Sequence, residues 1–346
     1  MILLSRRTFC AGISAAAVAP GAEARTAGFD AVVRKAGGTH SSLAEALAAA
    51  PPGDSPYRVL LGRGRWEERI TVSRANVAIV GEDRRGSVLR AAVASGLAKP
   101  PGGTWGTYGS ATLTVEAPGF SASKLTVENS FDYRANMMSQ AVKDAQAVPL
   151  LLGRGADRSV IDDCDLLGHQ DTFHPREGRA LVRGCLVAGH VDFIFGGAAV
   201  LFEGCEIRTR LRPGEALQGY VAAPSTPRTQ PYGLVFDRCR LTREAGVQNA
   251  STWLGRPWRS GGNTELLGHA AFLDCWMDGH IHPDGWTWMG YRGPGGYPVR
   301  LEPGDARLFE HGSGGPGARR SPSRRQLSAA EAGRCRRDVL AGWQPA

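Results

Sequence analysis

Two aspartates stand where apolar side chains would be expected. Asp171 lies in GHQDTFH and Asp192 in GHVDFIFGG, and both segments have the apolar content of short buried strands. A carboxylate is depleted in strands and is rarely buried unless it is paired. The two positions are 21 residues apart. If the chain repeats with that period, both side chains lie at the same place on neighbouring turns.

The cysteines indicate such a repeat. Five of them each follow an apolar run and a polar or small pair, and each precedes further apolar residues. The first three are 21 and 20 residues apart, and the later gaps of 34 and 36 residues fit one period plus an insertion. A period of about 20 residues with short strands and no helical pattern predicts a parallel β-helix. These five residues are Cys164, Cys185, Cys205, Cys239 and Cys275.

Stacked turns place neighbouring cysteines about 5 Å apart at Cα, which is within the range that a disulfide can bridge. We expect the cysteines to point inward. A stack of free buried thiols and a disulfide are both compatible with the pattern, and the favoured disulfide is Cys185–Cys205.

The first residues have the features of an export signal. The segment 5–9 carries a twin-arginine pattern, an apolar run follows over residues 11–19, and 22–24 has the small-x-small form of a signal-peptidase site. The run is too short to span a bilayer. We therefore assign residues 1–24 to a twin-arginine-like signal peptide and 25–346 to one exported domain, periplasmic or secreted, that does not contact a membrane.

The chain is basic, with 41 Lys and Arg against 33 Asp and Glu and a formal charge of +8. Without residues 1–24, which contain two arginines and one glutamate, the charge is +7. A basic surface favours anionic partners, which include nucleic acid, anionic lipid and acidic polysaccharide.

Two helices are predicted beside the strands. A helix over 41–52, with Ser41 or Ser42 as N-cap, would close the open end of the solenoid. A second is predicted over 328–343, after a Gly-, Ser-, Pro- and Arg-rich segment at 311–327 that we interpret as a solvated loop.

The repeat also brings polar side chains to the two aspartates. Gln146 lies 24 residues before Gln170, so three successive turns carry Gln146, then Gln170 with Asp171, then Asp192. Two adjacent carboxylates cannot both ionise cheaply, which yields a proton donor beside an anion, and the amide N–H groups could stabilise an oxyanion. Arg256, in LGRPWR, could hold one carboxylate bidentately.

The alternative is a polar ladder that only satisfies buried groups. Metal binding is disfavoured, because His169, His174 and His190 show none of the usual ligand spacings.

At this point the residues match a known family. The chain resembles the pectin methylesterases from about residue 29 to its C-terminus, and the combination of VDFIFG with GHQDTFH one turn earlier is specific. The matching segments are GRWEERITV (64–72), GSATLTV (109–115), QAVPLLL (146–152), GHQDTFH (168–174), VDFIFG (191–196) and LGRPW (254–258).

The resemblance implies an all-β fold, a single-stranded right-handed parallel β-helix, and hydrolysis of the C6 methyl esters of galacturonate in pectin (homogalacturonan). It implies that Asp192 is the nucleophile and Asp171 the general acid and base. Gln146 and Gln170 would form the oxyanion hole, and Arg256 would orient Asp192. The residues expected to contact the sugar are Trp258, Phe195, Val191, His174 and Thr112.

No metal or cofactor is implied, nucleic acid is not an expected partner, and a monomer is expected. His174 stands where the family usually has Tyr, and Pro149 where it has Ala, so substrate pattern or pH dependence could differ. Two other functions remain open at this stage: an exported β-helix esterase or thioesterase for another acyl substrate, and a non-catalytic carbohydrate-binding β-helix.

Overall fold

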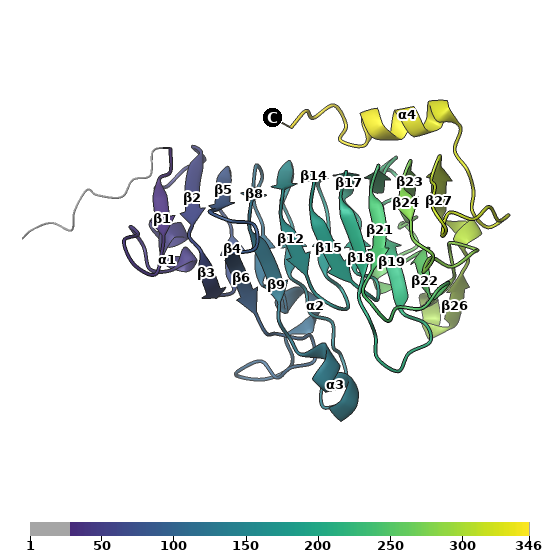
Figure 1. Ribbon diagram of the computed structural model, residues 1–346, viewed down its shortest axis with the longest axis horizontal. Helices are drawn as coiled ribbons and strands as arrows, with labels where there is room; N and C mark the ends of the chain where they lie inside the picture. Colours follow the sequence, from purple (N-terminus) through teal and green to yellow (C-terminus); the bar gives the residue numbers. More distant parts are fainter. Residues whose placement is uncertain (1–27, 346) are drawn as a thin grey trace, which may run out of the picture.

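The chain folds into a right-handed parallel β-helix, described here from a computed structural model that covers residues 28–345 (Figure 1). Three parallel sheets run along the solenoid, and most coils contribute one short strand to each sheet, whereas the coils at the two ends contribute fewer. The fold class therefore agrees with the prediction. The predicted signal peptide, residues 1–24, lies outside the described residues.

The largest sheet has ten strands, each hydrogen-bonded to the equivalent strand of the next coil. Its pairings are all parallel. In spatial order the strands are β1 (Ala31–Val33), β2 (Tyr57–Leu61), β5 (Val77–Gly81), β8 (Ser121–Ser123), β11 (Ser159–Asp162), β14 (Arg179–Arg183), β17 (Ala199–Glu203), β20 (Leu234–Asp237), β23 (His269–Leu273) and β27 (Arg307–His311).

The other two long sheets have eight and seven strands. The eight-stranded sheet contains β3 (Gly64–Glu67), β6 (Ser87–Ala91), β9 (Thr126–Asn129), β12 (Asp165–Leu167), β15 (Leu186–Gly189), β18 (Glu206–Thr209), β21 (Arg240–Arg243) and β24 (Trp276–Met277). The seven-stranded sheet contains β4 (Ile70–Val72), β7 (Leu113–Val115), β10 (Leu150–Leu152), β13 (Phe173–Pro175), β16 (Ile194–Gly196), β19 (Gly219–Pro224) and β22 (Thr252–Gly255).

Like side chains stack along the core because the register is maintained from coil to coil. Phe236 of β20 pairs with Phe202 on one side and Phe272 on the other, and the ring centroids are 4.5 and 4.3 Å apart with nearly parallel planes. Stacked aromatic pairs contribute about 0.5–1.5 kcal/mol beyond their buried area. The stacked side chains thus stabilise the strand register that the backbone hydrogen bonds already set.

The predicted cysteine stack is buried, and its thiols are free. The Cys185–Cys205 disulfide is not formed, and the alternative of free thiols holds for every described cysteine. The thiols of Cys185, Cys205, Cys239 and Cys275 each contact a carbonyl of the preceding coil instead, as Cys185 Sγ does with Ile161 O at 3.4 Å and Cys205 Sγ with Val182 O at 3.3 Å. The thiols therefore help to satisfy carbonyl groups of the preceding coil.

The residue before each cysteine makes the turn between two sheets. Its backbone is left-handed, with φ of 51° at Asp163, 60° at Gly184, 59° at Gly204 and 50° at Arg238. Glycine adopts this conformation freely, and Asp tolerates it better than most residues. This explains why the sequence repeat pairs a small or polar residue with the cysteine.

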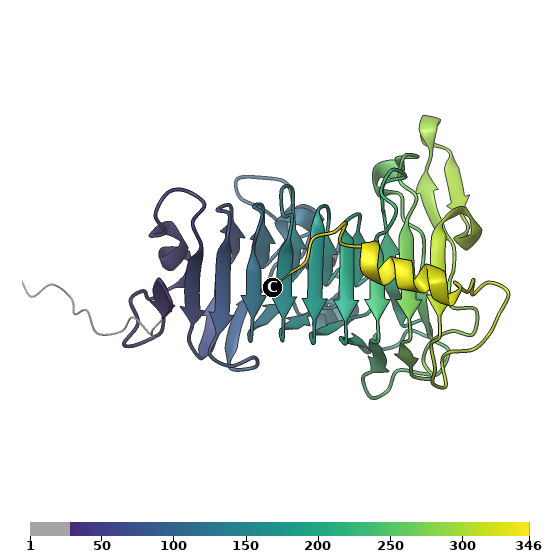
Figure 2. The same cartoon turned by 90° about the horizontal axis from the view of Figure 1, so that it is seen from above.

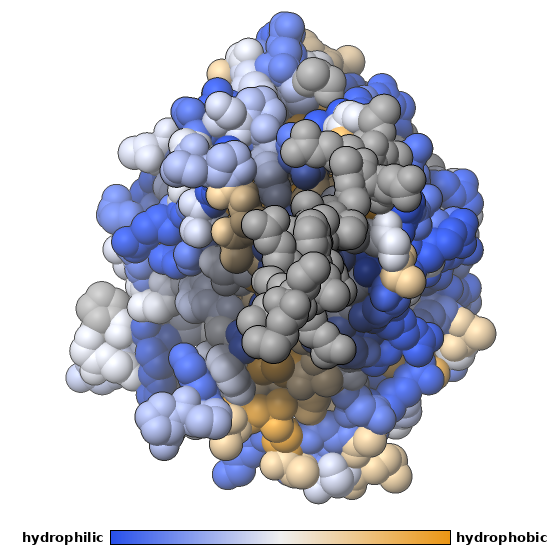
Figure 3. Space-filling view, turned by 90° about the vertical axis from the view of Figure 1, so that its left-hand side faces the viewer, coloured by the Kyte–Doolittle hydropathy of each residue, from blue (hydrophilic) through white to orange (hydrophobic). Residues whose placement is uncertain are grey.

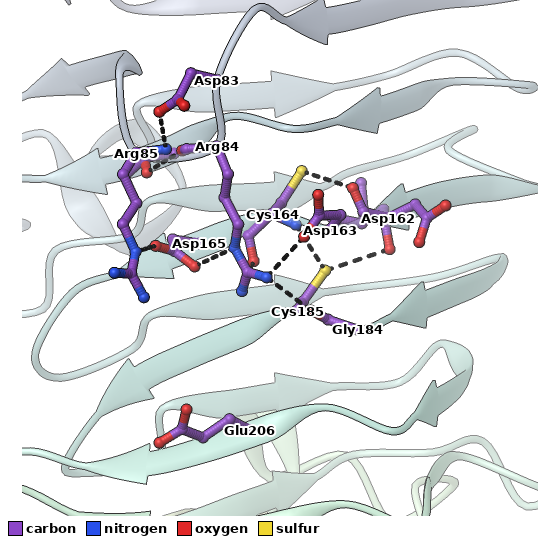
Figure 4. A network of polar contacts seen from close by, with 12 residues as sticks. Asp83, Arg84, Arg85, Asp162, Asp163, Cys164, Asp165, Gly184, Cys185 and Glu206 are labelled. Atoms are coloured by element: carbon purple, nitrogen blue, oxygen red, sulfur yellow. Dashed lines mark hydrogen bonds and ion pairs between the residues drawn. The ribbon is translucent and has the colours of Figure 1, made fainter.

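An arginine fastens several coils at this turn (Figure 4). Arg84 follows β5 and reaches over the coil of β8 and β9. Its Nε donates to Asp165 at 2.6 Å, Nη1 to Asp163 at 2.8 Å and to the Gly184 carbonyl at 3.0 Å, and Nη2 to the Cys164 carbonyl at 3.1 Å. Asp165 is only 4% exposed, so this contact compensates a buried carboxylate.

Helix α1 (Leu43–Ala48) covers the first coil, as predicted. Ser42 is its N-cap and accepts the Glu45 N–H, and Leu43 and Ala46 join the core. Beside it, Ala44, Leu47, Ile70 and Val72 are among the residues that line a shallow hollow of about 290 Å³. Figure 3 looks onto this end of the solenoid, where an apolar patch lies between hydrophilic flanks.

Helix α4 (Ala329–Asp338) lies on the outer face of the ten-stranded sheet (Figures 1 and 2). It begins at a capping box between Ser328 and Glu331. The segment before it was expected to be solvated, and this is wrong for Arg324. That side chain is 3% exposed and donates to Glu310 at 2.7 and 2.5 Å, because the segment folds back over the last coil.

Insertions between coils build the walls of a groove over the seven-stranded sheet. They include α2 (Gly106–Gly109), a turn η1 (Ser260–Gly262), and an antiparallel hairpin of β25 (Met289–Arg292) and β26 (Pro298–Leu301) that projects from the body in Figure 2. A further insertion carries α3 (Tyr133–Ser139). Two further turns are η2 (Pro294–Gly296) and η3 (Pro303–Asp305). Over residues 28–345, none of the helices combines the length and apolar character needed to cross a membrane.

Candidate active site

Asp171 and Asp192 lie opposite each other on adjacent coils. The pairing of β13 with β16 sets Phe173 against Ile194, and each aspartate lies two residues before its strand partner. The Asp171 N–H donates to the Val191 carbonyl at 3.1 Å, which continues the same register. The spacing of 21 residues thus corresponds to one coil at this point.

Both aspartates have a left-handed backbone, with φ of 64° at Asp171 and 48° at Asp192. Such a conformation costs about 1–3 kcal/mol in a non-glycine residue and is concentrated at functional sites. Here it interrupts the strand just before β13 and β16, and both residues line the same cavity. The following residues, Phe173, Phe193 and Ile194, return to the core.

Arg256 holds the carboxylate of Asp192 in a fork. Its Nε and Nη2 donate to the two carboxylate oxygens at 2.9 and 2.6 Å. The guanidinium also lies 3.8 Å from the ring centroid of Tyr220, and the Arg256 N–H donates to the Ala222 carbonyl at 3.0 Å. Arg256 directly follows β22, and its contacts with Tyr220 and Ala222 of β19 fix its position. The guanidinium therefore holds the Asp192 carboxylate in one orientation and supplies a positive charge beside it.

Asp171 has a different environment. Its side chain makes no ion pair or hydrogen bond within the described part of the chain, and the residue is 7% exposed. Burial first, and then the negative charge of Asp192, raises the pKa of Asp171 well above its ordinary value, although Arg256 acts in the opposite direction. One carboxylate is therefore paired with a cation, and the surroundings of the other favour its protonated form.

The two glutamines lie over the same cavity, one coil apart. Ala147 N–H, next to Gln146, donates to the Gln170 carbonyl at 3.2 Å and ties the two segments together. Gln146 Oε1 is buried and has no hydrogen-bond partner among residues 28–345. This leaves the amide nitrogen of Gln146 as the end directed to the cavity, where it can donate to an oxyanion.

The cavity that joins these groups has a volume of about 440 Å³. Three predicted sugar-contacting residues line it: His174, Phe195 and Trp258. His174 and Phe195 are stacked with ring centroids 4.0 Å apart, and the Phe195 and Trp258 centroids are 5.7 Å apart. A polar floor with aromatic walls suits a polar ring that also has apolar faces.

Comparison with known proteins identifies the family of the chain. The pectinesterase family model matches residues 30–294. Pectinesterase A of Dickeya chrysanthemi is 38% identical over 338 residues, which is 92% of each chain. The chain belongs to the pectinesterase family. It is accordingly a carboxylic ester hydrolase.

Solved structures of pectin methylesterases share the fold. The enzyme PemA from Erwinia chrysanthemi superimposes with a TM-score of 0.89 at 39% identity, over 92% of this chain and 98% of that one. The enzyme from Yersinia enterocolitica gives 0.85 at 38% identity, over 88% and 100%.

Two residues predicted to contact the sugar do not line the cavity. Thr112 is fully buried, and its hydroxyl donates to the Glu128 carbonyl of β9 at 2.9 Å, because the side chain turns toward the eight-stranded sheet. Val191 lies outside the lining, and its backbone links His190 and Asp171. Trp253 of β22, the other tryptophan near Arg256 in the sequence, stacks on His282 with ring centroids 3.7 Å apart and lines a different hollow.

Several lining residues were missed in the sequence. Thr107 and Tyr108 come from α2, Ser260 from η1 and Met289 from the start of the projecting hairpin, and Ala223 is in β19. In this chain the coil repeat can be detected from the sequence, but the insertions do not follow it. Only the aromatic character of Tyr108 and its glycine neighbours gave a local signal.

The histidines near the site form an aromatic cluster. The Tyr133 centroid is 5.1 Å from that of His169 and 4.3 Å from that of His190. Burial, followed by the charges of Arg210 and Arg134, lowers the pKa of His169 to about 3, so this imidazole is neutral in the working range. Within residues 28–345, no group of three or more His, Cys, Asp or Glu side chains is arranged to hold a metal ion.

Proposed function

We propose that this chain hydrolyses the C6 methyl esters of galacturonate in pectin, with Asp192 as nucleophile and Asp171 as general acid and base. The observation that carries the proposal is the contrast between the two carboxylates. Asp192 is paired with Arg256, while Asp171, in the same cavity, has a raised pKa and no side-chain partner among residues 28–345. An anion beside a proton donor is what nucleophilic cleavage of an ester needs.

In the first half-reaction, an Asp192 oxygen attacks the ester carbonyl carbon and forms a tetrahedral oxyanion. The amide groups of Gln146 and Gln170 donate hydrogen bonds to that oxygen. When the intermediate collapses, the bond to the methoxy group breaks and Asp171 gives its proton to the leaving oxygen. Methanol departs, and the galacturonyl group remains on Asp192 as an anhydride.

In the second half-reaction, water attacks the same carbonyl carbon. Asp171, now ionised, takes one proton from the water, and the glutamines again hold the oxyanion. Collapse releases Asp192 as a carboxylate and leaves a free acid on the polymer, which ionises. The net change is ester plus water to acid plus methanol, and both aspartates return to their first state.

The surroundings support a polysaccharide substrate. His174, Phe195 and Trp258 form the aromatic wall for the sugar, and the predicted mature charge of +7 favours a polymer that becomes anionic as the reaction proceeds. A relative of known structure was solved as a pectin methylesterase in complex with a hexasaccharide. We further propose export through a twin-arginine-like signal at residues 1–24, a mature domain over 25–346, and action as a monomer without a cofactor.

The experiment is methanol release from highly methyl-esterified pectin by the wild type and by Asp192→Asn. Asp54→Asn, an exposed aspartate far from the cavity, is the matched control. We expect release by the wild type and by Asp54→Asn, and a loss of at least about 1,000-fold in Asp192→Asn, because the covalent step is removed. Turnover of acyl thioesters without methanol release between pH 5 and 9 would overturn the substrate, and full activity in Asp192→Asn would overturn the nucleophile.

A further inference from the structure

A separate hollow lies further along the face of the solenoid that carries the cavity of the two aspartates. Trp253 of β22, which lines this hollow, pairs with Tyr220 of β19, two residues before Ala222. Ala222 pairs with Ile194, and Asp192 lies two residues before Ile194. Trp253 therefore has the position of Asp192, two coils further on. Because neighbouring coils are about 4.8 Å apart, the hollow begins roughly 10 Å from Asp192.

Three tryptophans line this hollow, which has a volume of about 500 Å³. Trp286 is buried and packs on the core, with its ring centroid 5.8 Å from that of Phe272. Trp253 is half-buried and is stacked on His282, with ring centroids 3.7 Å apart. Trp288 is 44% exposed although it is a large aromatic side chain. An exposed indole held by its neighbours provides a flat apolar surface on which the apolar face of a pyranose ring can stack.

The projecting hairpin of β25 and β26 (Figure 2) contributes to both the hollow and the cavity of the two aspartates. Met289 lines the cavity, whereas its neighbour Trp288 and Arg300 of β26 line the hollow. Adjacent residues of an extended segment point to opposite sides, so the hairpin forms a wall between the two. The Arg300 guanidinium lies 4.4 Å from the Trp288 ring centroid and supports the indole.

Polar groups beside the tryptophans are held in defined positions. Oδ1 of Asp284 accepts the Ser321 hydroxyl at 2.8 Å, and the Asp284 carbonyl accepts the Ser323 hydroxyl at 2.9 Å. The Asp284 N–H donates to His282 Nδ1 at 3.2 Å, which ties this residue to the stack of His282 on Trp253. The other carboxylate oxygen of Asp284 has no hydrogen-bond partner among residues 28–345. A free carboxylate oxygen beside aromatic rings can accept hydrogen bonds from the hydroxyl groups of a sugar.

The charges of the hollow disfavour an anionic ligand. The charged groups in its lining are Arg300, Asp284 and Glu302, which gives one cation against two anions. Arg300 is already paired, since its Nε lies 2.5 Å from a carboxylate oxygen of Glu302. A free galacturonate would therefore meet the uncompensated carboxylate of Asp284, whereas a methyl-esterified unit carries no charge.

We propose that this hollow binds uncharged, methyl-esterified units of pectin, with a pyranose ring stacked on Trp288 and its hydroxyl groups bonded to Asp284. The choice of pectin rests on the proposed function, because an enzyme that removes methyl esters gains from contact with ester-rich chain. A polymer held at both sites is released less readily than one held in the cavity alone. The contact is lost as de-esterification makes the chain anionic, so the hollow directs the enzyme to regions that still contain substrate.

The first test measures binding of a carboxyl-reduced hexagalacturonide by calorimetry. This ligand is uncharged, contains no ester and is not a substrate. Trp288→Ala should weaken its binding at the hollow about tenfold, and Trp288→Phe should recover part of the affinity. Tyr297→Ala, which removes an exposed aromatic ring from the same hairpin but outside the hollow, should bind as the wild type does. Equal affinity and stoichiometry in Trp288→Ala and the wild type, or equal weakening in Tyr297→Ala, overturns the proposal.

The same titration with unesterified hexagalacturonate tests the argument from charge. Trp288→Ala should leave the affinity for this anionic ligand unchanged, because the hollow does not bind it. An equal loss of affinity for both ligands overturns the preference for uncharged units.

The second test measures action on the polymer. In Trp288→Ala, KM for highly methyl-esterified pectin should rise about tenfold at unchanged kcat, and both constants should stay unchanged in Tyr297→Ala. A methyl-esterified trisaccharide is too short to cross the hairpin from the cavity to the hollow, so its kcat/KM should be equal in Trp288→Ala and the wild type. A loss on the trisaccharide as large as on the polymer overturns the proposal, because the effect would then lie in the cavity. Absence of methanol release in the wild type refutes the esterase function, whereas calorimetry with the ester-free ligand does not depend on turnover.

Discussion

Arg256 donates to both carboxylate oxygens of Asp192, at 2.9 and 2.6 Å, and Asp171 on the adjacent coil has no such partner in the described part of the chain. This asymmetry between two residues of the same type separates their roles. A counter-ion stabilises the charged form of one carboxylate, and burial beside that anion stabilises the neutral form of the other. The backbone of the two adjacent coils directs the side chains of Asp171 and Asp192 into the same cavity.

Loss of Arg256 should destabilise the fold as well as the activity. Arg256→Leu leaves Asp192 buried without a partner, so the free energy of unfolding at pH 7 should fall by about 3 kcal/mol and kcat/KM by at least about 100-fold. Urea unfolding and methanol release measure the two effects. The control is Arg183→Leu, since Arg183 makes a similar fork to Asp162 but these side chains are 43% and 37% exposed, against 20% and 11% for Arg256 and Asp192. That change should cost less than about 1 kcal/mol, and an equal cost at both sites would contradict the role of burial.

Asp171→Asn should change how stability depends on pH. The folded-state pKa of Asp171 is raised by burial, so above its unfolded pKa of about 4 the folded chain keeps a proton that the unfolded chain releases. Stability from this group is therefore present at low pH and lost as pH rises toward the folded-state pKa. Asparagine cannot ionise, so the variant should gain stability relative to the wild type as pH rises.

Urea unfolding from pH 4 to 9 measures this difference between Asp171→Asn and the wild type. Asp54→Asn, at an exposed aspartate, should show no such divergence. A constant difference across the range would mean that Asp171 titrates normally in the folded protein.

The same proton should be visible in the reaction. If Asp171 is the general acid, kcat should decline as pH rises through its raised pKa, and an infrared band of a protonated carboxyl should disappear over the same interval. The band should be absent in Asp171→Asn and present in Asp54→Asn. A band that persists in Asp171→Asn would assign the proton to another carboxyl group.

Much of this arrangement follows from the repeat. Strand pairing in a parallel β-helix converts a spacing of one coil into spatial contact, so the positions of Asp171 and Asp192 imply each other. The same rule identified the inward-facing cysteines. Arg256 lies beyond an insertion, and it was found from its chemistry and its motif rather than from spacing.

The coil repeat does not predict the remaining residues that line the cavity. Tyr108 and Met289 belong to insertions whose positions depend on contacts with distant coils, and neither lies at a repeating interval. Thr112 was assigned to the cavity because its motif is near the site, but its side chain points to the Glu128 carbonyl. A motif gives the coil on which a residue lies, and the local backbone decides which way its side chain points.

The cysteine stack gives a last prediction. The cysteines of the coils are at most 1% exposed, and burial raises the pKa of the Cys239 thiol well above its ordinary value. A thiol reagent cannot reach side chains buried to this degree, so these groups should resist it in the native protein. All described cysteines should react after denaturation without a reductant, because none is bridged. Thiol titration before and after unfolding measures this, and a reductant should leave the melting temperature unchanged. A deficit of two thiols in the denatured protein, recovered only with reductant, would show that a disulfide such as Cys185–Cys205 forms in the exported chain.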